Sequence, residues 1–515
     1  MALQKFKTQI TNNKTDSIKG LLVGVLVMGL GLLAIWPVVV NPARVANYGT
    51  DGELISWITN QTVQKVTGNF RRPEGQKYTI WDGNIFYPYR NVLGYSDLFM
   101  MAALWATLPV VITGNPAVTA GVGLVVGQLL TMGIAYWWWK EMTGERTGAM
   151  IAAVTLGWAQ FHFEYQVHLQ MWNMQYWLGA AYCFWKWMKT GRFGWGIGSA
   201  VLLGVQAWES VLPVYFAAAM MGTMAVFDIK FFRSNAKKII IFMLLAGGIM
   251  APPAMMYLRV SREFGYQRSI REAAHNGLSV DDTWSWFGNI GLVILVAVGV
   301  MKIIRHKRFN KDLRWMMVVA AVGYIMALGP VLKWQEKTVK VGRIFFPLPY
   351  TAAYYLVPGF GALRTPSRWI WLSGWAMCGV IALGFSEVNG RKSLVGIAGA
   401  LVVATAGGVH LTRYIDLPQW DTAPAVYKWL AEQPGQVVLE LPAGIENLED
   451  ERMMYSMWTK KTLINGTSGF SPPAAKGVKP DYIIVHQDEC SRFRIQCNGE
   501  GKVVWQDLNT VVYKL

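Results

Sequence analysis

Long apolar stretches alternate with short polar segments along most of the chain. Each stretch has roughly 15 to 25 residues, and a stretch of that kind predicts a helix that crosses a membrane. We expect about eleven crossings. They fall near residues 21–40, 116–139, 147–161, 173–188, 194–208, 211–228, 239–258, 289–304, 315–332, 369–386 and 394–410.

Beyond residue 410 the long apolar runs stop. Here the pattern predicts a helix at 424–432 and strands at 437–441, 482–486, 503–506 and 510–515, which indicates a small α/β domain.

Lysine and arginine gather in the short segments between apolar stretches. Such an excess is typical of cytoplasmic loops, so these segments are predicted to lie inside, and the first stretch is predicted to be a retained signal anchor. The longer polar segments 41–97, 162–172, 259–288 and 333–368 are then outside, with the tail. The basic clusters are 5–19, 140–146, 186–192, 230–238, 302–314 and 391–392.

A further apolar stretch, 97–113, lies between the first outer loop and the cluster at 140–146. Because the loop before these stretches is predicted to be outside and the cluster 140–146 inside, only one of the stretches 97–113 and 116–139 can cross the membrane. We expect 97–113 to form a short interfacial or half-buried helix on the outer side, because it is the shorter and ends in Gly-Asn-Pro.

Composition agrees with a membrane protein. Of the 515 residues, 53% are hydrophobic and 15% are charged, and the mean hydropathy is +0.27. About a quarter of the residues would be charged in a typical soluble domain. The net charge of +17 belongs to the predicted inside loops, which argues against a nucleic-acid partner. The fold class is therefore an all-α polytopic membrane domain, 1–410, with an extracytoplasmic α/β domain, 411–515.

The four cysteines fall into two pairs. Cys183 and Cys378 lie in predicted spans, where they serve as apolar packing. Cys490 and Cys497 lie in the tail, where an oxidising exterior permits a disulfide across a short loop.

Two carboxylates, Asp51 and Glu53, flank Gly52 just beyond the first apolar stretch. Ionisable groups at a membrane surface are costly to keep unless they bind a cation or take up a proton, so the triplet is a candidate for the acid end of an active site. The alternative is a polar turn in which Gly52 supplies an unusual backbone angle.

Arg364 and Arg368 precede the 369–386 span and are the best phosphate ligands, because guanidinium groups bind phosphate bidentately and stay charged near lipid. Snorkelling to lipid headgroups is the alternative. Arg343 is a weaker candidate in the same outer segment.

The remaining candidates are also on the predicted outer side. Asp82 is either a second acid or a turn aspartate, and Arg90 could contact phosphate. His162, Glu164 and His168 could bind sugar hydroxyls or a metal, although an isolated histidine is more often structural. Glu209 either caps a helix or lines the same cavity. Trp284 and Trp286 either stack against a sugar or belong to the aromatic belt at the membrane interface.

The order of these features resembles the GT-C superfamily of integral-membrane glycosyltransferases, with a first span, a long outer loop bearing Asp-x-Glu, further spans and an outside C-terminal domain. Several segments resemble a bacterial subgroup of that superfamily more specifically. They are 82–97 (DGNIFYPYRNVLGYSD), 168–173 (HLQMWN), 358–368 (PGFGALRTPSR), 438–442 (VLELP) and 465–472 (NGTSGFSP).

The resemblance implies a multi-pass enzyme of the cytoplasmic (inner) membrane that moves a hexosyl unit from a polyprenyl-phosphate donor to an extracytoplasmic glycan, lipid or protein acceptor. Asp51 and Glu53 match the two acidic positions of the motif. In that superfamily the first-loop acid acts as general base or helps to hold a divalent cation, Mg²⁺ or Mn²⁺. Two other classes remain open, a lipid-linked glycan flippase or transporter and a noncatalytic envelope-assembly protein.

Overall fold

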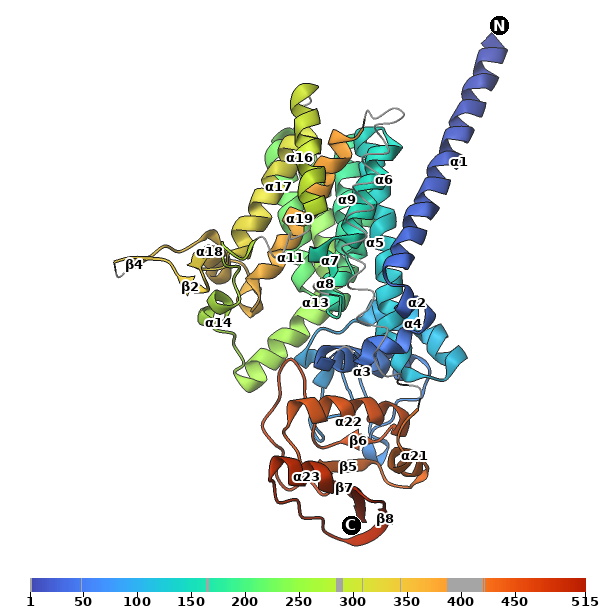
Figure 1. Cartoon of the computed structure of the whole chain (residues 1–515), viewed down its shortest axis with the longest axis vertical. Helices are drawn as coiled ribbons and strands as arrows, with labels where there is room; N and C mark the ends of the chain where they lie inside the picture. Colours follow the sequence, from blue (N-terminus) through green and yellow to red (C-terminus); the bar gives the residue numbers. More distant parts are fainter. Residues whose placement is uncertain are drawn as a thin grey trace.

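The computed structural model describes residues 2–47, 49–163, 166–283, 290–307, 309–342, 344–386, 420 and 422–515. A bundle of long helices forms one part of the molecule (Figure 1). A layer of shorter helices and loops crosses one end of this bundle, and a small α/β domain lies beyond the layer (Figure 1).

Every predicted crossing up to residue 386 coincides with one or more helices, and the crossing expected at 394–410 lies outside the described residues. Among the described residues, Pro116–Thr143 and Ala236–Phe264 are long and apolar enough to cross a membrane. The total number of crossings stays a prediction. The bundle helices are α1 (Ala2–Ala34), α5 (Thr119–Thr143), α6 (Arg146–Trp158), α9 (Gln175–Thr190), α10 (Phe193–Glu209), α11 (Leu212–Phe227), α13 (Ala236–Phe264), α16 (Ile290–Arg305), α17 (Lys311–Ala327) and α19 (Ile370–Gly384).

Tryptophans fill the centre of the bundle. The Trp138 ring from α5 lies 4.8 Å from that of Trp375 in α19 and 6.0 Å from that of Trp315 in α17, measured between ring centres. Trp138 and Trp375 are fully buried. Large aromatic side chains bury much apolar area each, so this cluster ties three helices that are distant in sequence.

Ion pairs link the predicted inside segments at one end of the bundle. Lys186 in α9 pairs with Glu141 in α5 at 2.7 Å, and Lys189 pairs with Asp312 in α17 at 3.2 Å. Lys311 pairs with Asp228 at 2.8 Å, just before α12 (Ile229–Ser234). The basic segments at 140–146, 186–192, 228–238 and 302–314 therefore meet on one side, as the charge pattern predicts.

The layer at the opposite end is built from the first outer loop. It contains α2 (Trp36–Val40), η1 (Pro42–Asn47), α3 (Gly49–Val66), η2 (Pro73–Gly75), η3 (Val92–Tyr95), α4 (Met100–Thr113) and η4 (Pro116–Val118). The helix expected at 97–113 is present as α4, beside α2 and α3 (Figure 1). Its exposed side includes Leu108 and Ile112, which are 65% and 73% exposed.

The tail forms a mixed sheet in the order β6-β5-β7-β9-β8. The strands β5 (Val437–Leu441) and β7 (Tyr482–His486) have the predicted bounds, and β8 (Lys502–Gln506) and β9 (Thr510–Lys514) differ from prediction by one residue at an end. The helix expected at 424–432 is α21 (Ala425–Glu432). The structure adds α22 (Glu446–Thr459), β6 (Thr462–Leu463) and α23 (Gln487–Phe493), and the boundary placed at 410/411 lies outside the described residues.

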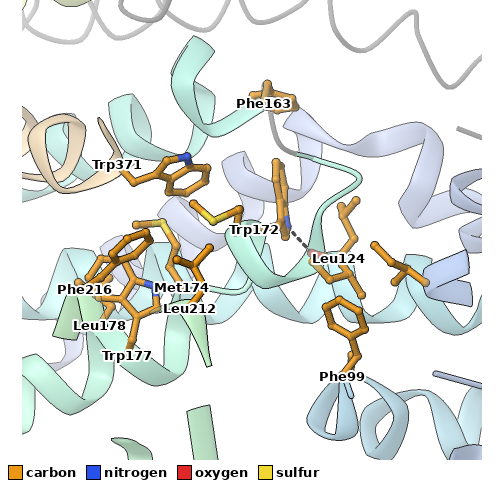
Figure 2. Packing of buried hydrophobic residues seen from close by; sticks show 14 of the residues in the cluster. Phe99, Leu124, Phe163, Trp172, Met174, Trp177, Leu178, Leu212, Phe216 and Trp371 are labelled. Atoms are coloured by element: carbon orange, nitrogen blue, oxygen red, sulfur yellow. Dashed lines mark hydrogen bonds between the residues drawn. The ribbon is translucent and has the colours of Figure 1, made fainter. Parts of the chain in front are cut away.

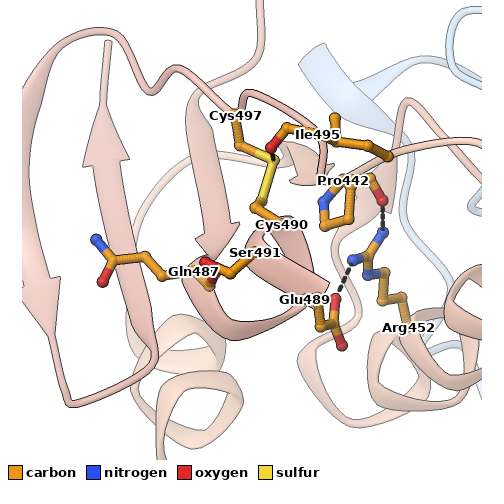
Figure 3. The surroundings of a disulfide bond; sticks show 8 residues. All are labelled: Pro442, Arg452, Gln487, Glu489, Cys490, Ser491, Ile495 and Cys497. Atoms are coloured by element: carbon orange, nitrogen blue, oxygen red, sulfur yellow. Dashed lines mark hydrogen bonds and ion pairs between the residues drawn. A yellow bond between two sulfur atoms is a disulfide. The ribbon is translucent and has the colours of Figure 1, made fainter. Parts of the chain in front are cut away.

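The predicted disulfide between Cys490 and Cys497 is confirmed, with Cα atoms 6.1 Å apart (Figure 3). It closes the loop after α23. Beside it, Arg452 of α22 donates to Glu489 and to the Pro442 carbonyl, both at 2.6 Å (Figure 3). These bonds tie α22 to α23 and to the end of β5.

A projection leaves the bundle after α17. It consists of the hairpins β1 (Lys333–Trp334) with β2 (Lys337–Thr338) and β3 (Lys340–Val341) with β4 (Ile344–Phe345). It is flanked by α14 (Ile270–His275) and α18 (Pro349–Leu356). Residues 358–368 then lead through η5 (Phe360–Ala362) and η6 (Pro366–Trp369) into α19.

Candidate functional site

Asp51 lies in the first turn of α3 and contacts His168, which precedes the short helix α8 (Leu169–Trp172). Oδ2 of Asp51 is 3.2 Å from Nε2 of His168. Burial, the charge of Arg368 and the charge of Arg364 together lower the pKa of His168 to about 4, although the charge of Asp51 acts in the opposite direction. The imidazole is therefore neutral at pH 7 and has one N–H to donate.

The effect of Arg364 and Arg368 on the pKa of His168 places these two predicted phosphate ligands near the histidine. Arg364 is exposed and follows η5, whereas Arg368 is half-buried within η6. Both positive charges act on the His168 ring. Four candidates from three distant segments, namely Asp51, His168, Arg364 and Arg368, are thus brought together on the outer layer.

Tight packing supports the His168 segment from below. The Trp172 indole, one turn after His168, is fully buried between the bundle helices and donates to the Leu124 carbonyl of α5 at 2.9 Å (Figure 2). Phe163 and Trp371 lie on neighbouring elements of this cluster (Figure 2). A ring held on several sides leaves little freedom to the chain that carries His168.

The Asp51-Gly52-Glu53 triplet is helical, so the alternative of a polar turn centred on Gly52 is wrong. The left-handed residue is Gly49, with φ of +69°, at the start of α3. Gly52 is required for a different reason, because a Cβ there would collide with the Val45 carbonyl of η1. The glycine lets α3 lie directly against the preceding backbone.

Glu53 is turned toward the tail domain. Burial, and after it the charges of Asp450 and Glu451 in α22, raise the pKa of Glu53 to about 8. The pKa of Asp450 also rises to about 8, through burial and then the charges of Glu446, Asp51 and Glu449. Asp450 is only 2% exposed, and its Oδ1 has no hydrogen-bond partner in the described structure. At neutral pH these two groups favour their protonated forms.

Two acids near the site were not among the residues predicted from sequence. Asp450 sits in an acidic run, Glu449 to Glu451, that resembles a solvated helix face. Asp97 stands at the end of the 82–97 segment; burial raises its pKa, while the Ser210 side chain, the charge of Arg368 and the Val211 N–H oppose this. An acid directly before an apolar helix was the available signal for Asp97, whereas no local signal marks Asp450.

Asp82 is not in this cluster, and its surroundings speak against the catalytic interpretation. The side chain is fully buried. It accepts bonds from Arg90 at 2.9 and 3.0 Å, from the Thr79 N–H at 2.7 Å and from the Asn91 N–H at 2.9 Å, and Arg72 lies 3.5 Å away. These donors hold the pKa of Asp82 low despite burial. Asp82 and Arg90 therefore fasten the first outer loop, and Arg90 is not a phosphate ligand at this site.

Glu209 and His162 are also structural in their contacts. Glu209 accepts from the N–H groups of Met101 and Ala102 at 3.0 and 3.1 Å and from Asn173 at 2.6 Å, so the helix-capping alternative holds, with α4 as the capped helix. His162 is fully buried and bonds Gln128 at 2.8 Å. Both side chains are buried in the described structure and bond to neighbouring helices, so these contacts do not support substrate binding by either residue, and that assignment stays a prediction.

Other predictions lie on residues outside the described ranges. These are Glu164, Trp284, Trp286 and Arg343.

The acids do not form a ready metal site. Asp51 and Glu53 are two residues apart in a helix, so their side chains leave it about 200° apart. Within the described ranges, no group of three or more His, Cys, Asp or Glu residues could hold a metal ion. The residues present do not fit the divalent cation that the GT-C resemblance implies, and the cation stays a prediction.

Comparison with known proteins identifies a similar fold but no family. A scan against protein-family models finds no match, and neither does a search of curated proteins. Among solved structures, the chain is similar to the cryo-EM structure of arabinofuranosyltransferase AftD from mycobacteria, with a TM-score of 0.58 and 10% identity. The similarity covers 96% of this chain and 39% of AftD, so the chain spans well under half the length of that protein and shares its fold.

Proposed function

We propose that the chain is a membrane glycosyltransferase that moves a sugar from a polyprenyl-phosphate donor to an acceptor on the outer side of the cytoplasmic membrane. The observation that carries the proposal is the convergence of Asp51, His168, Arg364 and Arg368 on one end of a bundle. The fold likeness to an arabinofuranosyltransferase and the resemblance to GT-C enzymes both favour glycosyl transfer over the other classes.

The outer location of the site is supported by the two ends of the bundle. The paired basic segments lie at one end, and Asp51 with the tail lies at the other. Because basic loops stay in the cytoplasm, the carboxylates and the disulfide-bonded tail would face outward.

Arg364 and Arg368 would bind the phosphate of the donor. As the bond between the sugar C1 and the phosphate oxygen breaks, the electron pair passes to that oxygen. Two guanidinium groups stabilise the added negative charge, which makes the lipid phosphate a better leaving group. Asp97 would fix Arg368 in place through its charge.

Asp51 would act as the general base. Its carboxylate takes the proton of the acceptor hydroxyl while the hydroxyl oxygen forms the new bond to C1. The neutral His168 ring, 3.2 Å away, donates to the carboxylate and orients it, and it does not compete for the proton because its pKa is about 4.

The decisive variant is Asp51→Asn, which keeps size and removes the base. Membranes with the variant, incubated with a panel of polyprenyl-phosphate sugars, should bind donor normally and transfer sugar roughly 100-fold more slowly than wild type. Asp488→Asn in α23, an exposed acid of the tail, is the matched control and should be fully active.

Wild-type turnover that Asp51→Asn fully matches would reject the base. Donor movement across vesicles without any sugar transfer would favour the flippase instead.

A further inference from the structure

The projection between α17 and α18 exposes an unusual amount of apolar surface. We call residues 331–342 and 344–347 the outer arm. Trp334 and Phe345 are each 53% exposed, Phe346 is 57% exposed and Ile344 is 68% exposed. Further along the chain, Tyr355 and Leu356 at the C-terminal end of α18 are 68% and 80% exposed. Several large apolar side chains exposed on one short segment indicate a binding surface rather than chance exposure.

The arm has a defined shape. Its base is closed by pairing between Val331 and Pro347 and by the bond from the Leu348 N–H to the Pro330 carbonyl at 2.8 Å. Beyond the base, two short hairpins carry the exposed side chains. The hairpins extend sideways from the bundle, across the direction of the long helices, near the end that carries the outer layer (Figure 1).

Positive charge accompanies the apolar side chains. Lys337 and Lys340 are exposed on the hairpins, and the one acid of the arm, Glu336, is paired with Lys333 at 2.7 Å. Exposed apolar side chains beside lysines that form no ion pair with this acid suit a bilayer interface, where acyl chains lie next to headgroup phosphates.

The arm also continues the lipid-facing side of the bundle. On α17, the helix that leads into it, Met317, Val318 and Ile325 are 57%, 38% and 39% exposed. Apolar side chains on the outside of a spanning helix face acyl chains.

We propose that the outer arm lies in the outer leaflet, with its aromatic and aliphatic side chains at the boundary of headgroups and acyl chains and with Lys337 and Lys340 at lipid phosphates. The arm anchors the outer layer to the membrane surface. This inference does not depend on the glycosyltransferase assignment.

Site-specific labelling tests the depth of the arm. Phe345→Cys can be labelled selectively with the fluorophore NBD, because Cys183 and Cys378 are buried and Cys490 is bonded to Cys497. The labelled full-length protein is placed in vesicles of phosphatidylethanolamine and phosphatidylglycerol. Leu508→Cys is the control, since Leu508 is 95% exposed in the turn between β8 and β9 of the tail.

Lipids with a nitroxide high on the acyl chain should quench the label at position 345 several-fold more than the label at position 508. The label at 345 should also be shielded from aqueous iodide. Equal quenching at the two positions, or full access of iodide to 345, would overturn the proposal. Efficient cross-linking of position 345 between two copies, with no lipid quenching, would overturn it in favour of a second chain.

A charge variant tests the role of the lysines. Lys337→Glu with Lys340→Glu should reduce lipid quenching at position 345 in vesicles that contain phosphatidylglycerol and should matter less in purely zwitterionic vesicles. Both substitutions are on exposed positions, so the fold should be retained, and size-exclusion chromatography checks this. Unchanged quenching in both vesicle types would show that Lys337 and Lys340 do not contribute to membrane binding of the arm.

Discussion

Asp51 and Glu53 stand two residues apart in one helix, yet their surroundings give them different chemistry. The Asp51 side chain is 51% exposed and accepts from a neutral histidine. Glu53 faces α22, and its pKa of about 8 means that it holds a proton at pH 7. Neighbouring acids with divergent environments are a common basis for separate acid and base roles. Asp51 is therefore the residue suited to accept a proton.

The phosphate site can be tested at the level of single side chains. Replacing Arg364 and Arg368 together by Gln should weaken binding of undecaprenyl phosphate by purified protein, because each charge-assisted contact contributes roughly 1.5–3 kcal/mol. Arg271→Gln, an exposed arginine of α14 on the same outer face, is the control. Unchanged affinity in the double variant would assign both arginines to lipid headgroups.

Asp450 provides a pH prediction. Its pKa rises from an ordinary 3.8 to about 8 on folding, so the folded protein holds more protons than the unfolded chain between these pH values. Stability therefore falls as pH rises through this window. Asp450→Asn cannot ionise and should be more stable than wild type at about pH 9, by an amount on the order of 1–3 kcal/mol, with little difference near pH 4.

Thermal unfolding in the presence of EDTA measures this difference, and Asp488→Asn serves as a control without a shift. A loss of stability in Asp450→Asn at high pH would contradict the prediction, because it would mean that a cationic group of the protein stabilises the ionised carboxylate.

At the scale of elements, the contact between the first outer loop and the tail places Asp450 beside α3. Asn84 is the centre of that contact. Its Oδ1 accepts from Trp57 of α3 at 2.8 Å, and its Nδ2 donates to the Lys461 carbonyl at 2.7 Å and to Ser456 of α22 at 3.2 Å. The backbone of the same segment bonds Leu463 of β6, so the loop extends the edge of the tail sheet.

Asn84→Ala should loosen this docking. It leaves the Trp57 N–H and the Lys461 carbonyl without partners, at a cost of roughly 2–4 kcal/mol in total. Hydrogen exchange of α22 and β6 should quicken while exchange in the helix bundle stays unchanged. Asn69→Ala, an exposed asparagine of the same loop, should have no effect. Unaltered exchange in α22 would show that other contacts hold the tail.

At the scale of the whole molecule, the ion-paired basic segments and the Asp51 site lie at opposite ends, which predicts a topology. In intact spheroplasts, a membrane-impermeant maleimide should label Leu508→Cys in the tail and should not label Lys237→Cys in α13. Lysis should expose position 237. Protection of the tail until lysis would reverse the orientation and remove the outer-face site.

Much of the architecture was predictable because it depends on local patterns. Apolar length predicted the bundle helices up to α19, and alternation predicted β5 and β7 with their observed bounds. The same local reasoning offered a polar turn at Gly52 as an alternative, since a glycine that serves close helix packing and one that serves a turn look alike in sequence. It also assigned Asp82 to catalysis, because a buried acid with two arginine partners cannot be told from a reactive one without its neighbours.

The sequence by itself determined the apolar helices, the basic segments between them, the acid pair Asp51 and Glu53 and the disulfide pair, because hydrophobicity, charge and residue type act over short distances along the chain. Only the tertiary structure decided which polar residues meet. It placed His168 beside Asp51 and the charges of Arg364 and Arg368 near His168, gave Glu209 to the start of α4, and brought Asp450 from the tail to Glu53. These outcomes depend on how distant segments pack, and burial and neighbouring charge, which set each acid's chemistry, exist only after that packing.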